Sequence, residues 1–157
     1  MNIAGGSVYP LVPGHECVGI VAAIGEDVTN LRIGDTVGVG PIIDSCGICE
    51  NCKEGNEHLC EAEFVRVVGG KKLFDRVAGN PNTLTAGAFS GSMVVNEHFV
   101  IKLPAGMNLE RTAPLLASGL TVYEPLKRYM KMGSSVRAQI FQVGTVGVLG
   151  LGGLTKL

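Results

Sequence analysis

The chain has 157 residues, which is enough for one domain or slightly more, and 46% of them are hydrophobic against 17% charged. This composition indicates a folded globular protein, and the net charge of −1 gives no reason to expect nucleic acid or an anionic membrane surface as a partner. Tryptophan is absent and the 23 glycines are about twice the normal usage, so we predict a mainly β chain with many turns.

The N-terminal residues do not form a basic segment followed by an apolar one, and no apolar run of the chain reaches the length of a membrane span. We therefore expect neither a secretory signal nor contact with a membrane. Clustered cysteines in such a chain are typical of a reducing compartment, so we predict a cytoplasmic protein.

Two short strands are predicted near the N-terminus. An apolar run at residues 18–25 follows a turn rich in proline and glycine, and residues 31–39 alternate into a second strand that a Gly-Asp turn interrupts. His15 and Glu16 stand side by side where the first turn meets the first strand. Taken alone, they are most simply a polar pair hydrogen-bonded to the turn. The order of strand, turn and strand favours a small antiparallel barrel or sandwich.

A zinc lobe is predicted at residues 44–60, where four cysteines follow the spacing C-x2-C-x2-C-x7-C. The four are Cys46, Cys49, Cys52 and Cys60. The short steps bring neighbouring sulfurs to one metal and the longer return closes the tetrahedron. Four cysteine ligands leave no open position for water, so this zinc would be structural. Free thiols and two disulfides are the alternatives, but disulfides suit a small secreted domain and would leave the fifth cysteine, Cys17, without a partner.

The region after the lobe is predicted to be surface followed by two strands. Residues 61–86 mix basic with acidic side chains, which favours a solvated surface over a basic patch. Residues 87–95 return to an apolar, strand-like pattern, and residues 99–104 form another short strand that Pro104 ends.

A helical region is predicted from residue 109 onward. Asn108 precedes it as a candidate N-cap, because its side-chain oxygen can accept a hydrogen bond from the first turn. The helical pattern continues to Met132, although Pro125 must then lie in a first turn or at a kink.

The last segment is an apolar strand that runs from residue 143 into the sequence Gly150-Leu151-Gly152-Gly153-Leu154. This is how a dinucleotide-binding turn opens, which makes Gly150, Gly152, Gly153 and Leu154 candidate cofactor-binding residues. Thr155 replaces the third glycine of that fingerprint, and a glycine-rich apolar tail is an equally good interpretation. Such an uncharged, β-prone run would favour self-association.

Together these stretches resemble the medium-chain zinc-dependent alcohol dehydrogenases, most closely the cinnamyl alcohol dehydrogenase-like branch. The segments that carry the resemblance follow in family order: YPLVPGHECVG (9–19), GDTVGVG (34–40), the cysteine lobe, GAFSGSMVVNEHFVIKLP (87–104), APLLASGLTVYEPL (113–126) and GLGGL (150–154). The resemblance implies a partial catalytic domain of the chaperonin-10-like (GroES-like) β-barrel type over residues 1–108. Connecting helices and the first strand of a Rossmann domain would follow over residues 109–157. It also implies NADP(H)-linked oxidation of a small alcohol or reduction of an aldehyde.

The same resemblance implies a second, catalytic zinc, with His15 as a ligand and Glu16 as its acidic neighbour. The family supplies two further ligands from cysteines, but the first of these positions falls before residue 1 and the other is Ala117 here. Cys17 stands where the family has an apolar core residue. We therefore predict a fragment of an alcohol dehydrogenase that is inactive alone, and the alternative is a non-catalytic, zinc-stabilised β module from a decayed copy of such an enzyme.

Overall fold

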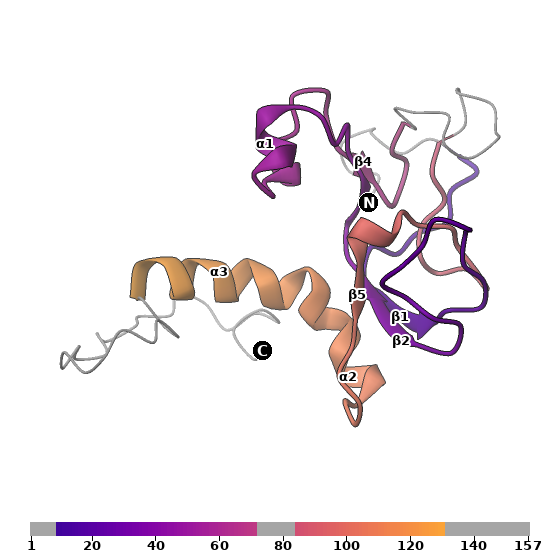
Figure 1. Ribbon diagram of the computed structural model, residues 1–157. Helices are drawn as coiled ribbons and strands as arrows, with labels where there is room; N and C mark the ends of the chain where they lie inside the picture. The colour runs from indigo at the N-terminus through magenta and orange to yellow at the C-terminus, as the bar shows by residue number, and fades with distance from the viewer. Residues whose placement is uncertain (1–8, 72–83, 131–157) are drawn as a thin grey trace.

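The computed structural model describes residues 9–71 and 84–130. Its central feature is a three-stranded antiparallel sheet in the order β1-β2-β5, formed by β1 (Cys17–Ile20), β2 (Thr36–Val39) and β5 (Val100–Lys102) (Figure 1). The register places Val39 opposite Cys17 on one side and Val100 on the other. The predicted strand from residue 143 and the candidate cofactor-binding residues Gly150, Gly152, Gly153 and Leu154 lie outside the described residues.

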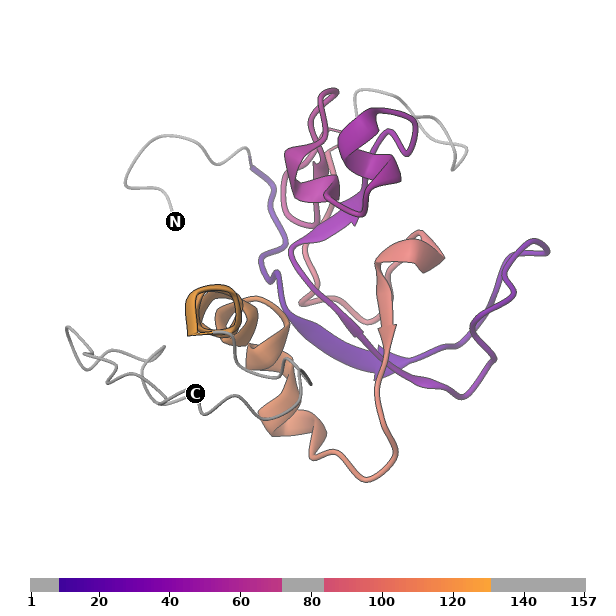
Figure 2. The same cartoon turned by 60° about the vertical axis from the view of Figure 1, so that its left-hand side comes forward.

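The cysteine lobe stands above this sheet on a second, two-stranded antiparallel sheet (Figures 1 and 2). Its elements are β3 (Ile42–Asp44), α1 (Glu50–Lys53), η1 (Glu57–Leu59) and β4 (Val65–Arg66). Only two residues separate β2 from β3, so the chain passes directly from the central sheet into the lobe.

Helices gather in the C-terminal part of the described chain. They are η2 (Glu97–Phe99), α2 (Leu109–Thr112), η3 (Ala113–Leu116) and α3 (Ser118–Met130). The predicted N-cap is confirmed, since the Asn108 side chain accepts a 3.1 Å hydrogen bond from the Arg111 N–H at the start of α2. Pro125 lies inside α3 rather than in a first turn.

The third helical turn, η3, covers part of the central sheet. Leu116 lies over Gly38 of β2, where a Cβ atom would come within 2.8 Å of Leu116 Cδ2. A side chain at position 38 would therefore push η3 away from the sheet. From this contact α3 leads outward, away from the strands (Figure 1).

The main apolar core lies between the two sheets. Its buried members are Val39, Ile43, Val65 and Val67, and Met93, Val95 and Val100 pack against them. Val65 and Val67 are 2% and 1% exposed. The predicted solvated surface at residues 61–86 is therefore wrong for these two valines, although Arg66 and Lys71 are exposed.

The mainly β prediction is confirmed, but the strands are shorter than the sequence pattern indicates. β1 ends at Ile20, whose partner Thr36 is the first residue of β2. After Ile20, two further hydrogen bonds of 2.9 Å join Val21 to Asp35 and Gly34, and the chain then leaves the sheet.

Residues 87–95, predicted as a strand, form none. The N–H of Gly87 donates to the Val12 carbonyl at 2.9 Å, and the two following N–H groups also donate to the 12–14 segment. The backbones approach so closely that a Cβ at Gly87 would lie 2.3 Å from the Pro13 carbonyl oxygen. Irregular contacts of this kind satisfy the backbone without a regular ladder. No helix among the described residues is both long and apolar enough to cross a membrane.

Candidate metal centre and the His15–Glu16 site

The four cysteines of the lobe are carried by consecutive short elements. Cys46 follows β3, Cys49 stands immediately before α1, Cys52 lies within α1 and Cys60 follows η1. The turns between them are made by Gly47 and Gly55, whose φ angles are 69° and 78°. Side chains other than glycine rarely adopt this left-handed conformation, so the glycines let the chain reverse tightly enough to bring the thiols together.

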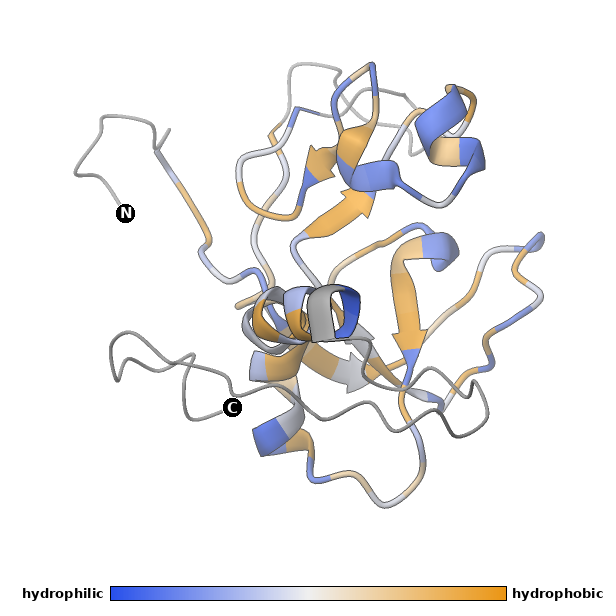
Figure 3. Ribbon diagram, turned by 90° about the vertical axis from the view of Figure 1, so that its left-hand side faces the viewer, coloured by the Kyte–Doolittle hydropathy of each residue, from blue (hydrophilic) through white to orange (hydrophobic). Residues whose placement is uncertain are grey.

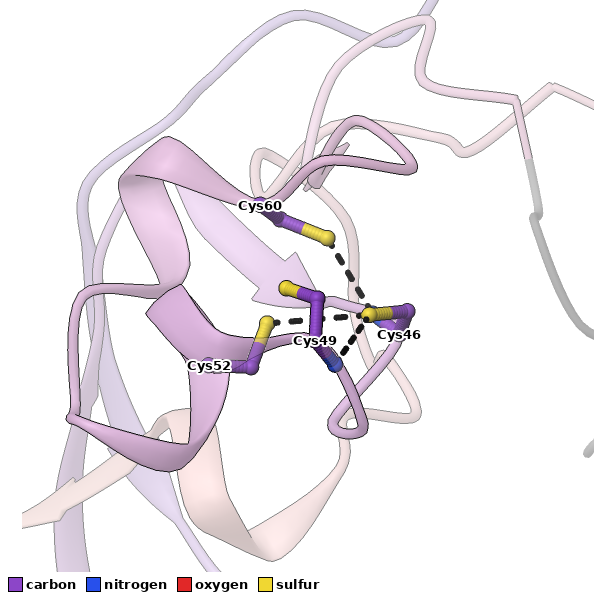
Figure 4. A group of neighbouring side chains, drawn as sticks. All are labelled: Cys46, Cys49, Cys52 and Cys60. Carbon is purple, nitrogen blue, oxygen red and sulfur yellow. Dashed lines mark hydrogen bonds between the residues drawn. The ribbon is translucent and has the colours of Figure 1, made fainter.

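The four sulfur atoms converge on one point (Figure 4). All of them lie within 4.8 Å of one another, and those of Cys46 and Cys52 are 3.9 Å apart. With Zn–S bonds of about 2.3 Å, a tetrahedral four-sulfur site has sulfur–sulfur distances of about 3.8 Å. The donor set and its spacing therefore fit a tetrahedral zinc ion. Within residues 9–71 and 84–130, no other group of three potential ligands converges in this way.

Backbone hydrogen bonds prepare the site for anionic sulfur. The Cys49 N–H donates to Cys46 Sγ at 3.3 Å, and the Cys46 N–H donates to Cys60 Sγ at 3.5 Å. The N–H groups of Ile48 and Cys49 together lower the pKa of Cys46 to about 6. Zinc binds the thiolate form, so a thiol that ionises near neutral pH is a good first ligand.

The pKa of the Cys52 thiol is shifted in the opposite direction to that of Cys46. The Ser45 hydroxyl lies 3.4 Å from Cys52 Sγ and lowers the pKa of that thiol. Burial, and hydrogen bonds that the Cys52 thiol makes to Cys49 and Cys60, outweigh this effect and raise its pKa to about 11. Without a cation, four neighbouring sulfurs cannot all ionise, so zinc binding must displace protons from the cluster.

The cysteine-bearing segment 44–60 has almost no apolar interior besides these sulfurs. Between residues 44 and 60 the buried side chains are Ser45, Cys46, Cys52 and Cys60, and Cys49 and Phe64 pack against the three cysteines. The large aliphatic side chains point outward instead: Ile48 is 73% exposed and Leu59 is 58% exposed. Helix α1 is mostly hydrophilic (Figure 3). A segment of this kind cannot be held by hydrophobic burial, which makes a metal its natural centre.

His15 and Glu16 form a second, very different group at the entrance to β1. His15 is exposed, and its Nε2 lies 4.0 Å from Glu16 Oε2. The other carboxylate oxygen of Glu16 accepts hydrogen bonds from the N–H groups of Ala117 (2.9 Å) and Ser118 (2.8 Å). These N–H groups open α3, so Glu16 provides the cap that a side chain of the helix itself would normally supply.

Cys17 turns away from this group into the core. Its sulfur contacts Met93 Sδ at 3.7 Å, and burial raises the pKa of the thiol. Ala117, the position that the family resemblance gives to a cysteine ligand, has no donor atom in its side chain. Among the described residues, the donors near His15 are thus one imidazole and a carboxylate already engaged by a helix. They do not fit a three-ligand catalytic zinc site.

Two contacts of the lobe could not be found from the sequence. Glu57 and His98, 41 residues apart, form a 2.5 Å hydrogen bond, and Asn96 reaches Asp44 at 3.3 Å. The sequence gives no signal for either contact, because both depend on where β5 and η2 lie relative to the lobe. The sequence gives no signal for the role of Glu16 at α3 either, because its hydrogen-bond partners lie about 100 residues later in the chain.

The fold and the lobe define a β domain with a four-cysteine metal-type lobe, and comparison with known proteins identifies its family. Residues 1–105 match the alcohol dehydrogenase GroES-like domain. The chain belongs to this alcohol dehydrogenase family.

Individual relatives agree with that assignment. A probable cinnamyl alcohol dehydrogenase from Populus deltoides is 44% identical over 154 residues, which cover 96% of this chain and 40% of the relative. A cinnamyl alcohol dehydrogenase from Sorghum bicolor has a similar structure, with a TM-score of 0.73 and 42% identity over 80% of this chain and 34% of that one. A Helicobacter pylori structure, described as a complex with NADP(H), gives a TM-score of 0.71 and 38% identity over 79% of this chain and 34% of that one. The chain spans about 40% of the length of the curated relatives it matches. The GroES-like fold and the zinc alcohol dehydrogenase resemblance are therefore confirmed.

Proposed function

We propose that this chain is the zinc-stabilised part of an NADP-linked alcohol dehydrogenase, which oxidises a small alcohol or reduces the corresponding aldehyde, and that the 157 residues alone do not catalyse this reaction. The observation that carries the proposal is the convergence of four thiols in a domain of the alcohol dehydrogenase family. The proposal extends to a cytoplasmic protein that binds neither nucleic acid nor membrane, as the sequence analysis predicts.

The zinc ion in this proposal is structural. Cys46, Cys49, Cys52 and Cys60 would fill all four positions of a tetrahedral ion, which leaves none for substrate or water. The ion would supply the folding energy that the lobe lacks, because Ile48 and Leu59 point to solvent.

NADP(H) and an aromatic alcohol or aldehyde are proposed on similarity. The Helicobacter pylori relative is described as a complex with NADP(H), and several relatives are described as cinnamyl alcohol dehydrogenases. Gly150, Gly152, Gly153 and Leu154 would open the cofactor site, since a glycine turn after an apolar strand lets a pyrophosphate approach the backbone.

Inactivity of the isolated chain is proposed from the His15–Glu16 group. In the family a catalytic zinc acts as a Lewis acid on the substrate oxygen. Here one imidazole is accompanied by a carboxylate that caps α3 and by Ala117, so no set of three ligands is available among the described residues. A second candidate function, a non-catalytic zinc-stabilised β module, is favoured by the same observation, because the Glu16 carboxylate caps α3.

The test measures metal content and turnover on the same preparation. We expect about one zinc per folded, chelator-washed chain, and no zinc-dependent consumption of NADPH with an aromatic aldehyde. A zinc-stripped sample is the control. Two zinc ions per chain, or zinc-dependent turnover, would show that the second site is complete, whereas no bound zinc would contradict the metal centre itself.

Self-association through residues 143–154 is part of the proposal and has its own test. This run is apolar and uncharged, and in a full family member it would be a buried strand. Deletion of residues 143–157 is expected to improve solubility. Lower solubility after the deletion would show that the run packs against the rest of the chain.

A further inference from the structure

The short helix η2 lies between the cysteine lobe and the central sheet, and its side chains reach three separate segments. The Glu97 carboxylate accepts hydrogen bonds from the Thr29 and Asn30 N–H groups at 3.3 and 3.4 Å. The residues on either side of it, Asn96 and His98, both reach the lobe. Because β5 follows η2 directly and pairs with β2, this turn is fixed to the central sheet.

The contact of His98 leads to the fourth cysteine. His98 Nε2 lies 2.5 Å from Glu57 Oε1, and this hydrogen bond lowers the pKa of that carboxylate. Glu57 is the first residue of η1, and its carbonyl accepts a 3.1 Å hydrogen bond from the Cys60 N–H. A continuous set of hydrogen bonds thus runs from the sheet side of the molecule to Cys60.

The contact of Asn96 leads to the third cysteine. Its side-chain amide donates to Asp44 Oδ1 at 3.3 Å, and the same oxygen accepts the Ser45 N–H at 3.0 Å. The Ser45 hydroxyl lies against Cys52 Sγ. Asn96 also fixes its neighbour, because its Oδ1 accepts the His98 N–H at 3.1 Å. Two of the four cysteines, Cys52 through its sulfur and Cys60 through its backbone N–H, are therefore connected to η2 through different residues.

The segment between Cys52 and Cys60 is the longest connection within the cluster, and it decides whether the fourth sulfur reaches the others. It has little apolar anchorage, since Leu59 is 58% exposed. The side chain of Glu57, by contrast, is only 16% exposed and is held by His98. Residues that orient metal ligands from outside the coordination sphere commonly change metal affinity by about 10–100-fold when they are replaced.

We propose that His98, acting through Glu57, is a positioning residue of the four-cysteine metal centre: it holds the return segment so that Cys60 completes the site and zinc leaves slowly. This inference rests on the proposed zinc binding. It assigns to η2 the role of a brace that joins the metal lobe to the sheet.

The experiment measures the rate of zinc release into an excess of a metallochromic chelator, using the full 157-residue chain. His98→Ala and Glu57→Ala are each expected to release zinc about tenfold faster than the wild type, at the lower end of the range for such residues because the His98 side chain is 63% exposed. The double variant should release zinc no faster than either single variant, since both changes break one contact. His98→Gln, whose amide nitrogen can take the place of Nε2, should recover part of the wild-type rate.

The matched control is His58→Ala, which removes an exposed imidazole from the same turn as Glu57 and should release zinc at the wild-type rate. The absorption of the cobalt-loaded form should stay at its wild-type value in the His98 variants, because all four sulfurs remain, and this separates positioning from loss of the site. Release from His98→Ala at the wild-type rate, or strictly additive effects in the double variant, would overturn the inference while the zinc site stands. A wild-type chain that retains no zinc would overturn both.

Discussion

The cysteine lobe and the His15–Glu16 group are the two places where the sequence predicts a zinc ligand, and the structure assembles them differently. The lobe gathers its four donors from 15 consecutive residues, Cys46 to Cys60, so local turns are enough to assemble it. The catalytic zinc site that the family resemblance implies would need donors from segments about 100 residues apart, and one of those positions is Ala117. A site made by one short segment stays complete unless that segment changes, whereas a site assembled from distant segments is lost with any one of them.

The hydrogen bonds of the two sites differ in the same way. In the lobe, backbone N–H groups donate to the sulfurs of Cys46 and Cys60, which favours their ionised form. At the other site the backbone N–H groups of α3 point at Glu16 and engage the carboxylate. Backbone N–H groups thus donate to sulfur atoms in the lobe, whereas at the other group they bind a carboxylate to the start of α3.

The largest effect is expected from Cys60→Ser, which removes one ligand from the complete site. Structural zinc contributes an apparent ~10 kcal/mol or more in small zinc domains, so this variant should lose its zinc and the lobe should become sensitive to protease between residues 47 and 59. Metal analysis and limited proteolysis measure this. Cys17→Ala is the control, because Cys17 packs in the core and its loss should leave the zinc content unchanged. If Cys60→Ser retained its zinc, the four cysteines would not be the zinc ligands, and the contrast between the two groups would fail.

A smaller effect is expected from Glu16→Ala, which removes the cap of α3. Two hydrogen bonds from backbone N–H groups to a carboxylate are lost, and the free energy of unfolding should fall by about 1–3 kcal/mol. Hydrogen exchange at the Ser118 amide should become faster, while zinc content stays the same. Glu16→Gln keeps an oxygen acceptor and should cost less. Loss of zinc from Glu16→Ala would mean that the two sites are not independent.

The pH dependence of stability should show a still smaller contribution from Asp35. Lys102 Nζ lies 2.7 Å from Asp35 Oδ2, and this hydrogen bond, together with that from the Arg32 N–H, lowers the pKa of Asp35. A folded-state pKa below that of the unfolded chain stabilises the fold above the ordinary value of about 3.9, and this is lost as the pH falls through the folded value. The melting temperatures of wild type and Asp35→Asn should therefore differ near pH 6 and converge in acid. A difference that grows toward acid would contradict this sign.

No gain is expected from Ala117→Cys, although it restores a ligand type at the incomplete site. The new thiol would join one imidazole and a carboxylate that the helix engages. Hydride transfer also requires a nicotinamide held close to the substrate carbon, and a thiol at position 117 does not provide this. Zinc content should stay near that of the wild type, and NADPH consumption with an aromatic aldehyde should remain at the level of a zinc-stripped control. A second bound zinc or measurable turnover would show that the His15 site is closer to completion than proposed.

Sequence alone predicted what depends on local spacing. The cysteine spacing indicated a cluster that the structure shows, and Asn108 was recognisable as an N-cap because its partner is three residues away. The prediction of a strand at residues 87–95 was wrong. The apolar pattern matches a strand, but the backbone of residues 87–89 bonds to the irregular segment 12–14 instead of to a neighbouring strand. Glu16 could be placed beside His15, but its partners at α3 follow more than 100 residues later, where no local pattern points to them.

Helix α3 is held by Glu16 at its first residues, so a small rotation there moves its far end by a larger distance. Its 13 residues span about 20 Å, and Glu16 holds the first of them beside β1. A rotation of about 10° at that end would move the other end by about 3.5 Å, by the geometry of a rod of that length. The contact of Glu16 with the start of α3 therefore sets the direction in which this helix leaves the sheet.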